Sequence, residues 1–173
     1  MGISFDQLTT RLYLGSLPCE PIDVSILREH LMVTHVVAVC AERPREVLAA
    51  LLGDSGRFFS YVPIIEASPD PALLRRAVLA VEAALGAGPA QTVYLHCWLG
   101  RHRSAAVAAG LLVRQGLFKT FSQAHGFLRE RRPEVQPIEL GEAFAVMIQV
   151  LANDMDFRFP ARGGATLVGD LLK

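Results

Sequence analysis

Short apolar runs rich in β-branched residues alternate along this chain with segments whose apolar positions follow a helical spacing. Such runs are typical of strands buried on both faces of a parallel sheet, and the spacing between them is typical of helices that cover it. The predicted strands are 11–15, 34–40, 58–65 and 92–96, and the predicted helices are 23–29, 44–52, 71–86, 103–115, 122–131 and 139–152.

Residues that favour helix ends support several of these boundaries. Asp70 is a good N-cap, and Pro71 suits the first turn of the helix that follows. Pro44 is expected to open the preceding helix at its first position for the same reason. Strands that alternate with helices in this way predict an α/β fold with a central, mostly parallel sheet flanked by helices.

The length of 173 residues fits one domain, which we expect to cover residues 1–152. Residues 153–173 contain Pro160 and two adjacent glycines, and we expect a C-terminal tail there. Two interpretations of this tail stay open, a terminus with no role of its own and a segment that docks on a partner.

Composition excludes several classes of function. The 17 Lys and Arg residues balance the 17 Asp and Glu residues, so we do not expect the protein to bind nucleic acid through a broad basic surface. The three cysteines include no C-x-x-C pair, which argues against a disulfide framework and a cysteine metal site. No signal-peptide pattern or membrane-length apolar run is present, so we expect a cytoplasmic protein without membrane insertion.

One segment carries the residues needed for chemistry, HCWLGRHRS at residues 96–104. It joins a predicted strand to a predicted helix, and α/β sheets bind ligands at such junctions. Gly100 permits a tight loop whose N–H groups face an anion, and the guanidinium of Arg103 can take two phosphate oxygens. A cysteine in that positive field, Cys97, is expected to be a thiolate and a nucleophile toward a bound phosphoryl group.

The same segment resembles the His-Cys-x5-Arg-Ser signature of the cysteine-dependent protein tyrosine phosphatases. Flanking residues are most similar to the dual-specificity group, namely Leu12–Ser16, Thr34–Val37 and Arg131–Pro133. The resemblance covers roughly residues 11–150 and implies the dual-specificity phosphatase fold.

The resemblance also implies roles for the residues of the segment. Cys97 matches the nucleophile, Arg103 the phosphate clamp, Ser104 the hydroxyl that stabilises the leaving thiolate, and His96 a residue that structures the loop. The implied phosphate-binding residues are Trp98, Leu99, Gly100, Arg101, His102 and Arg103. Arg101 resembles a position at which phosphoinositide-type members meet a second phosphate, and a solvated arginine at the pocket rim is the other interpretation.

Two carboxylates are candidates for the general acid. The family places an Asp in the register apolar-Pro-apolar-x-Asp, whereas VPIIE at residues 62–66 puts Glu66 there. Asp70 has the expected residue type but also caps a predicted helix. Both assignments stay open, as does a role for Glu66 as a solvated loop residue.

A second cysteine ends the predicted strand 34–40, in a stretch that is similar to one in tensin-type lipid phosphatases, where a cysteine lies near the catalytic one. Cys40 is therefore a candidate redox partner of Cys97, with an inert core thiol as the alternative.

These features predict a phosphatase that hydrolyses phosphate monoesters through a phosphocysteine, with no cofactor and no metal. A dual-specificity protein phosphatase acting on phosphorylated Tyr and Ser/Thr is the first hypothesis. A phosphoinositide or other small-molecule phosphatase is the second, and a phosphate-binding module with weak catalysis is the alternative from another class. The expected partner is a phosphorylated protein or a small phosphorylated substrate.

Overall fold

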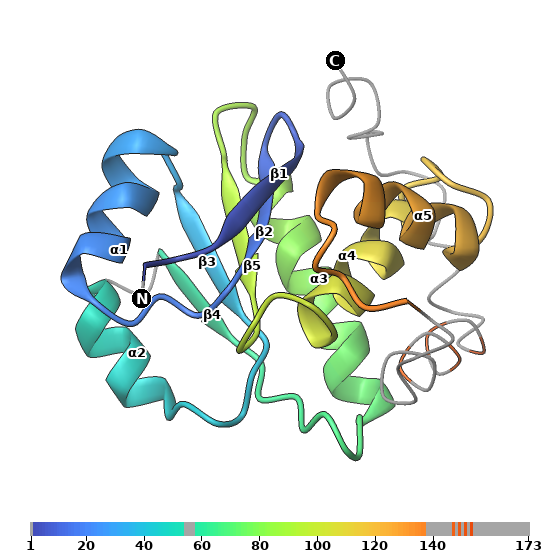
Figure 1. Ribbon diagram of the computed structural model, residues 1–173, viewed down its shortest axis with the longest axis horizontal. Coiled ribbons are helices and arrows are strands. Elements are labelled where there is room, and N and C mark those ends of the chain that lie inside the picture. Colours follow the sequence, from blue (N-terminus) through green and yellow to red (C-terminus); the bar gives the residue numbers. More distant parts are fainter. Residues whose placement is uncertain are drawn as a thin grey trace.

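The structure is a computed structural model that describes residues 2–53 and 58–137, together with positions 147, 149, 151 and 153. Its elements are, in chain order, β1 (Phe5–Thr9), β2 (Leu12–Gly15), α1 (Pro21–Ser25), the π-helix η1 (Ile26–His30), β3 (His35–Ala38), α2 (Arg45–Leu52), β4 (Phe59–Tyr61), α3 (Pro71–Gly86), β5 (Val93–His96), α4 (Arg103–Arg114) and α5 (Phe121–Arg131). The sheet separates α1 and α2 on one side from α3, α4 and α5 on the other (Figure 1).

The strands form one sheet in the order β1-β2-β5-β3-β4. Strands β2, β5, β3 and β4 run parallel to one another, and β1 pairs with β2 in the antiparallel direction. The expected α/β fold with a mostly parallel sheet is therefore confirmed. The edge strand β1 has no counterpart in the predicted pattern, because only its end, Leu8 and Thr9, is buried and it lacks a continuous apolar run.

All four predicted strands are longer than the observed ones, and the difference exceeds one residue in β3 and β4. Strand β4 ends at Tyr61 rather than at residue 65, because Pro63 has no N–H with which to continue the ladder. Strand β3 ends at Ala38, so Cys40 lies just beyond the strand and not at its last position. The chain nevertheless stays beside β5 there, since the Val39 N–H donates to the His96 carbonyl at 2.8 Å.

The predicted helix boundaries are largely confirmed. Asp70 caps α3 by accepting a hydrogen bond from the Ala72 N–H at 2.8 Å, and Pro71 is the first residue of that helix. Helix α2 begins one residue later than expected, because Pro44 takes the N-cap position with extended backbone. The predicted helix 139–152, the boundary at residue 152 and the tail 153–173 lie outside the continuous described ranges.

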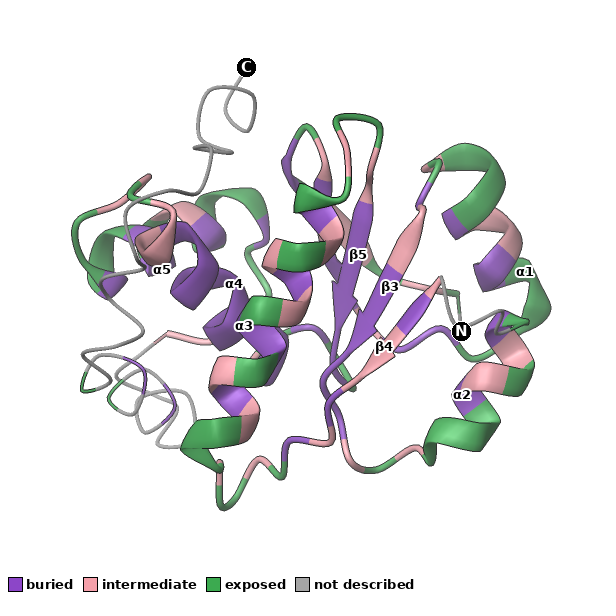
Figure 2. Cartoon of the chain, turned by 180° about the vertical axis from the view of Figure 1, so that it is seen from behind, coloured by how far each residue is buried: buried purple, intermediate pink, exposed green. Residues whose placement is uncertain are grey.

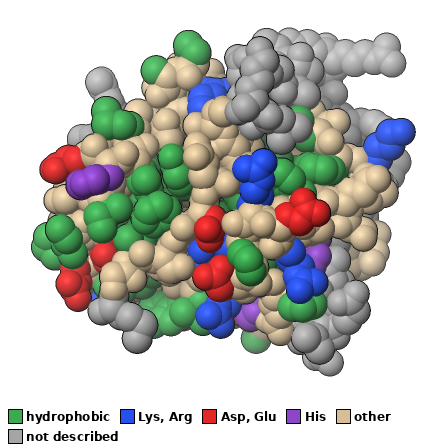
Figure 3. Space-filling model, turned by 45° about the horizontal axis from the view of Figure 1, so that its top comes forward, with side chains coloured by type: hydrophobic (Ala, Val, Ile, Leu, Met, Phe, Trp, Pro, Cys, Tyr) green, Lys and Arg blue, Asp and Glu red, His purple; other side chains and the backbone are tan. Residues whose placement is uncertain are grey.

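The core lies between the sheet and the helices, and α4 is its most buried helix (Figure 2). Every residue from Arg103 to Leu112 is buried, and small side chains let this helix approach both the sheet and its neighbours α3 and α5. On the face drawn in Figure 3, acidic and basic side chains are interspersed rather than segregated by sign. Within the described ranges no helix is both long and apolar enough to span a membrane.

Candidate active site

The predicted phosphate loop lies where the parallel strands end. It follows β5 at Cys97 and leads into α4 at Arg103, so it meets the positive end of a 12-residue helix. Gly100 has a φ of 71°, and a Cβ at this position would lie 2.4 Å from the Gly15 carbonyl oxygen. Both the left-handed backbone and the close approach to β2 therefore require glycine here.

Hydrogen bonds hold the carbonyl groups of this loop away from its centre. The Trp98 carbonyl accepts from the Leu17 N–H at 3.0 Å, and the Arg101 carbonyl accepts from the Gln136 N–H at 3.3 Å. The buried guanidinium of Arg132 donates to the two carbonyls between them, to Leu99 at 3.1 Å and to Gly100 at 3.0 Å. With the carbonyls fixed outward, the N–H groups are free to face an anion.

Cys97 is the first residue of the loop and is 2% exposed. Burial opposes ionisation of its thiol, yet the pKa of Cys97 is lowered. The cause is a hydrogen bond from the Ser104 hydroxyl at 3.2 Å, further hydrogen bonds from the N–H groups of Ser104 and Gly100, and the charge of Arg103. The site therefore favours the thiolate, which is the nucleophilic form.

Arg103 is 1% exposed and is fixed by acidic and backbone groups. Its Nη1 donates to Glu42 Oε2 at 2.6 Å and to the Ile64 carbonyl at 3.1 Å, while Nη2 lies 3.2 Å from Glu66 Oε2. Although burial disfavours its charge, the hydrogen bond to Glu42 and the nearby acids raise the Arg103 pKa. Its Nε is buried and has no hydrogen-bond partner among the described residues, which leaves one donor of the guanidinium unused.

The structure separates the two candidate acids. Glu66 lines the same pocket as Cys97 and pairs with two residues of the loop, Arg103 through Oε2 and His102 through Oε1. Asp70 is exposed, caps α3 and is not among the residues that line this pocket. The register of residues 62–66 thus brings Glu66 to the loop, and the helix-capping interpretation of Asp70 accounts for its contact.

His96 is fully buried behind the loop. Its Nδ1 lies 3.0 Å from the Cys97 carbonyl, so it donates there, and Nε2 has no partner among the described residues. Burial lowers the His96 pKa to about 4, so the ring is neutral at neutral pH. A neutral imidazole that holds the peptide of the nucleophile fits the role of a residue that structures the loop.

Cys40 is buried beside the site at the end of β3. Burial, followed by repulsion from the charge on Cys97, raises the Cys40 pKa to about 12. The electrostatic interaction with Cys97 agrees with the adjacent positions of β3 and β5 in the sheet. Cys40 and Cys97 are both free thiols in this structure.

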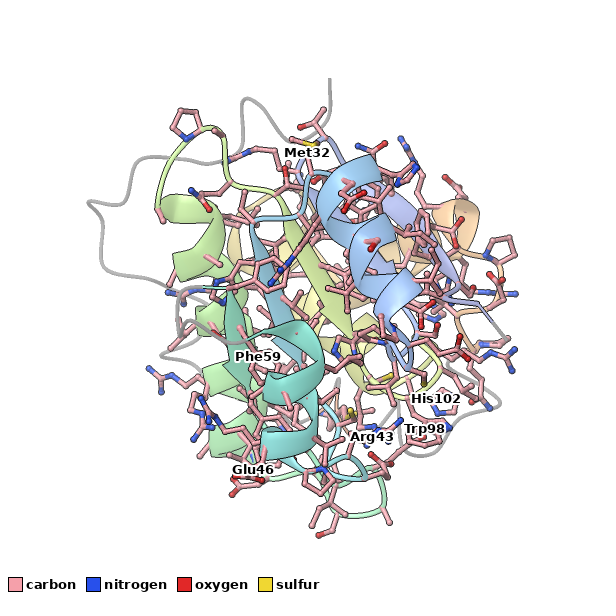
Figure 4. The ribbon with its side chains drawn as sticks, turned by 90° about the vertical axis from the view of Figure 1, so that its left-hand side faces the viewer. Met32, Arg43, Glu46, Phe59, Trp98 and His102 are labelled. Carbon is pink, nitrogen blue, oxygen red and sulfur yellow. The ribbon has the colours of Figure 1, made fainter. Side chains whose placement is uncertain are left out.

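The loop and its neighbours enclose a pocket of about 230 Å³. It is lined by Glu42, Glu66, Cys97, Trp98, Leu99, Arg101, His102 and Arg103. Figure 4 shows Trp98 and His102 close together at the end of the molecule where Arg43 also lies. No group of three or more His, Cys, Asp and Glu side chains within the described ranges is placed to hold a metal ion.

Two residues that the sequence did not single out for the site take part in it. Glu42 fixes one side of Arg103, and its only signal in the sequence is an acidic residue just after a buried strand. Arg132 belongs to the Arg-Pro corner in the resemblance, but its contacts with the loop carbonyls depend on how α5 packs. Neither contact follows a local spacing pattern, because each partner is more than 30 positions away.

Comparison with solved structures identifies the fold. The PTP-2 phosphatase of Cydia pomonella matches with a TM-score of 0.66 at 19% identity, over 84% of this chain and 88% of that chain. Human DUSP28 matches with a TM-score of 0.61 at 25% identity, over 85% of this chain and 91% of that chain. PTPMT1 in complex with PI(5)P matches with a TM-score of 0.63 at 18% identity, over 86% and 97% of the two chains.

No protein-family model and no curated protein sequence matches this chain. The structural similarity therefore rests on the arrangement of the elements rather than on overall sequence identity. It confirms that the chain has the fold of the dual-specificity and tyrosine-type phosphatases, as the signature at residues 96–104 implies.

Proposed function

We propose that this protein is a phosphatase that hydrolyses phosphate monoesters through a phosphocysteine intermediate on Cys97. The observation that carries the proposal is the lowered pKa of a buried thiol in a loop that ends at a fixed guanidinium. A thiolate at the centre of an anion-binding loop is a nucleophile aimed at the phosphorus atom of a bound phosphate. The phosphatase fold of the structural neighbours supports the same chemistry.

In the first half of the reaction, the loop N–H groups and Arg103 bind the phosphate oxygens. The Cys97 thiolate attacks phosphorus, so an S–P bond forms while the P–O bond to the leaving group breaks. The leaving oxygen takes the electron pair of that bond and a proton from Glu66, which becomes a carboxylate. Arg103 stabilises the charge on the transferring phosphoryl group.

In the second half, water releases the phosphate. The Glu66 carboxylate takes a proton from water as the water oxygen attacks phosphorus, and the S–P bond breaks. The electron pair of that bond returns to sulfur as a thiolate. Ser104, whose hydroxyl lies 3.2 Å from the Cys97 sulfur, stabilises this thiolate, and inorganic phosphate leaves.

The substrate class that we propose is a phosphorylated protein side chain, with activity toward Tyr and toward Ser/Thr. The pocket of about 230 Å³ is smaller than the roughly 300–1,000 Å³ typical of sites that enclose a drug-sized ligand. The pocket is large enough for the phosphate and the group that carries it, while the rest of the substrate lies outside the pocket. Exposed Trp98, Leu99 and Ile65 offer an apolar rim for that remainder.

A second candidate substrate is a phosphoinositide. Arg101 lines the pocket and is exposed, so its charge can meet a second phosphate. The similarity to PTPMT1 in complex with PI(5)P favours this candidate. Against it stand Glu42 and Glu66 in the pocket wall, because they offset the positive charge that a polyphosphorylated ring needs.

Steady-state turnover of a substrate panel tests both candidates. The panel contains phosphotyrosine, phosphoserine and phosphothreonine peptides together with phosphoinositide vesicles, and Cys97→Ser is the control. We expect release of phosphate from the peptides by the wild type and none by Cys97→Ser, which should still bind inorganic phosphate through the loop and Arg103. Preferential release from the vesicles would favour the second candidate, and binding without release from any substrate would indicate a phosphate-binding module.

A further inference from the structure

His102 is the loop residue that the mechanism above does not use. It lies between Arg101, whose carbonyl is fixed by the Gln136 N–H, and Arg103 at the start of α4, so its backbone is well anchored. Its Nδ1 makes a short contact with Glu66 Oε1, which bridges the phosphate loop to the loop that carries the acid. Both side chains line the pocket and are about one-third exposed.

Glu66 and a bound phosphate compete for one side of Arg103. The side-on donors of the guanidinium are Nε, which is buried without a partner among the described residues, and Nη2, which contacts Glu66 Oε2. Nη1 is already occupied by Glu42 and the Ile64 carbonyl. A phosphate that is bound in bidentate fashion uses Nε and one N–H of Nη2 together, and its negative charge replaces that of Glu66 as the partner of this side of the guanidinium.

After this exchange, Glu66 has lost its contact with Arg103 and faces a dianion. Like charges at short range repel, so a carboxylate with no other hold would turn away from the pocket. The charged or titratable groups that line the pocket with Glu66 are Glu42, Cys97, Arg101, His102 and Arg103, and the ion pairs of Glu66 are with His102 and Arg103. Of the cationic groups and donors in this set, His102 is the one that keeps its contact with Glu66 when the phosphate binds.

We propose that His102 is the positioning residue of the general acid: it holds Glu66 by Oε1 when the substrate phosphate displaces Oε2 from Arg103. The proposal rests on the proposed phosphatase function and on Glu66 as its acid. The Nδ1–H of His102 donates to Oε1, and Oε2, once released from Arg103, takes up a proton from solvent before the chemical step. The Oε2–H bond breaks as the leaving oxygen accepts that proton with the electron pair of the broken P–O bond.

The test compares two substrates that differ in their need for an acid. Phenyl phosphate has a poor leaving group that requires protonation, whereas the nitrophenolate of 4-nitrophenyl phosphate leaves without it. For His102→Ala and His102→Ser we expect kcat on phenyl phosphate to fall roughly tenfold more than kcat on 4-nitrophenyl phosphate. The second variant keeps a hydrogen-bonding hydroxyl, which is too short to reach Glu66.

His102→Asn should recover most of this difference, since its amide nitrogen can take the place of Nδ1. In a Glu66→Gln background, adding His102→Ala should leave the ratio of the two kcat values unchanged, because the group that it positions is gone. The matched control is His30→Ala on the remote helix η1, which should not alter the ratio in either background.

Equal losses on both substrates would overturn the proposal, because a residue that only supports the loop lowers both rates alike. A further change of the ratio in the Glu66→Gln background would also overturn it, since His102 would then act without Glu66. A wild-type protein that turns over neither ester would instead refute the proposed function. The two failures are distinguishable, because an inactive wild type refutes the phosphatase function whereas equal losses in the His102 variants refute only the role of His102.

Discussion

The Ser104 hydroxyl donates a hydrogen bond to the Cys97 sulfur across 3.2 Å. Both side chains are buried, Cys97 directly after β5 and Ser104 in the first turn of α4. The bond therefore joins the two elements that form the phosphate loop and stabilises a negative charge in a place where burial alone would oppose it.

Removal of this hydroxyl should make the nucleophile harder to ionise. The Cys97 pKa is lowered in the folded protein, and Ser104→Ala deletes its principal stabilising hydrogen bond, so the pKa should rise. We expect the rate of Cys97 alkylation by iodoacetamide to reach half its maximum at a higher pH in this variant. Ser122→Ala on the exposed side of α5 is the control, and an unchanged pH profile for Ser104→Ala would contradict the assignment.

Arg103→Lys should impair turnover severely while leaving a positive charge. An ammonium group cannot keep Glu42, the Ile64 carbonyl and a bidentate phosphate at the same time, as the planar guanidinium can. We expect kcat to fall roughly a hundredfold, as for the loss of a donor that stabilises transition-state charge. Near-normal kinetics of Arg103→Lys on 4-nitrophenyl phosphate would show that bidentate binding of phosphate by the guanidinium is not needed.

Substitution of Asp70 should affect the stability of the protein, whereas substitution of Glu66 should affect its activity. Asp70→Ala removes the side-chain cap of α3 and should lower the free energy of unfolding by about 1 kcal/mol with little loss of turnover. Glu66→Gln should slow phenyl phosphate far more than 4-nitrophenyl phosphate. Urea unfolding and turnover of the two aryl esters measure both effects, and the reverse result would transfer the acid role to Asp70.

Arg132 should be essential for the shape of the phosphate loop. Its side chain is 1% exposed, donates to the Leu99 and Gly100 carbonyls and pairs with Asp6 at 2.7 Å. Arg132→Met leaves these groups without their partner, and we expect a loss of about 3 kcal/mol in unfolding free energy. The affinity of the folded variant for inorganic phosphate, measured by calorimetry, should fall as well. Normal phosphate affinity would mean that the loop holds its shape without Arg132.

Cys40 should protect Cys97 from irreversible oxidation. Peroxide converts the Cys97 thiolate to a sulfenic acid with release of hydroxide, and the Cys40 thiol then condenses with it to give a disulfide and one water. Because its pKa is raised to about 12, Cys40 stays protonated and is not the first target of peroxide. Peptide mapping after mild peroxide should find the Cys40–Cys97 bridge, with activity restored by thiol.

The matched variant Cys40→Ser should lose activity to peroxide faster and without recovery. Equal rates of irreversible inactivation in Cys40→Ser and in the wild type would make Cys40 an inert core thiol. Cys19, which is exposed near α1, provides the control, since Cys19→Ser should behave as the wild type.

Much of the architecture follows from local sequence patterns. The continuous apolar run that ends at His96 is β5, the central strand with all its residues buried, because a strand covered on both faces needs such a run. Asp70 and Pro71 mark the start of α3, since capping depends only on residues within one turn. The prediction failed where the local pattern is weak. The polar edge strand β1 was not predicted, and β4 was predicted to be too long because Pro63 ends its hydrogen-bond ladder early.

By itself, the sequence also determined the core of the candidate site. Cys97, Gly100, Arg103 and Ser104 lie within one strand-loop-helix segment, where spacing alone fixes their relative positions. Only the tertiary structure decided that Glu66 and not Asp70 lies at the loop, and that Glu42 and Arg132 hold it. These contacts join segments that are distant in the chain. They arise from the order of strands in the sheet and the packing of α5, which no local pattern of residues encodes.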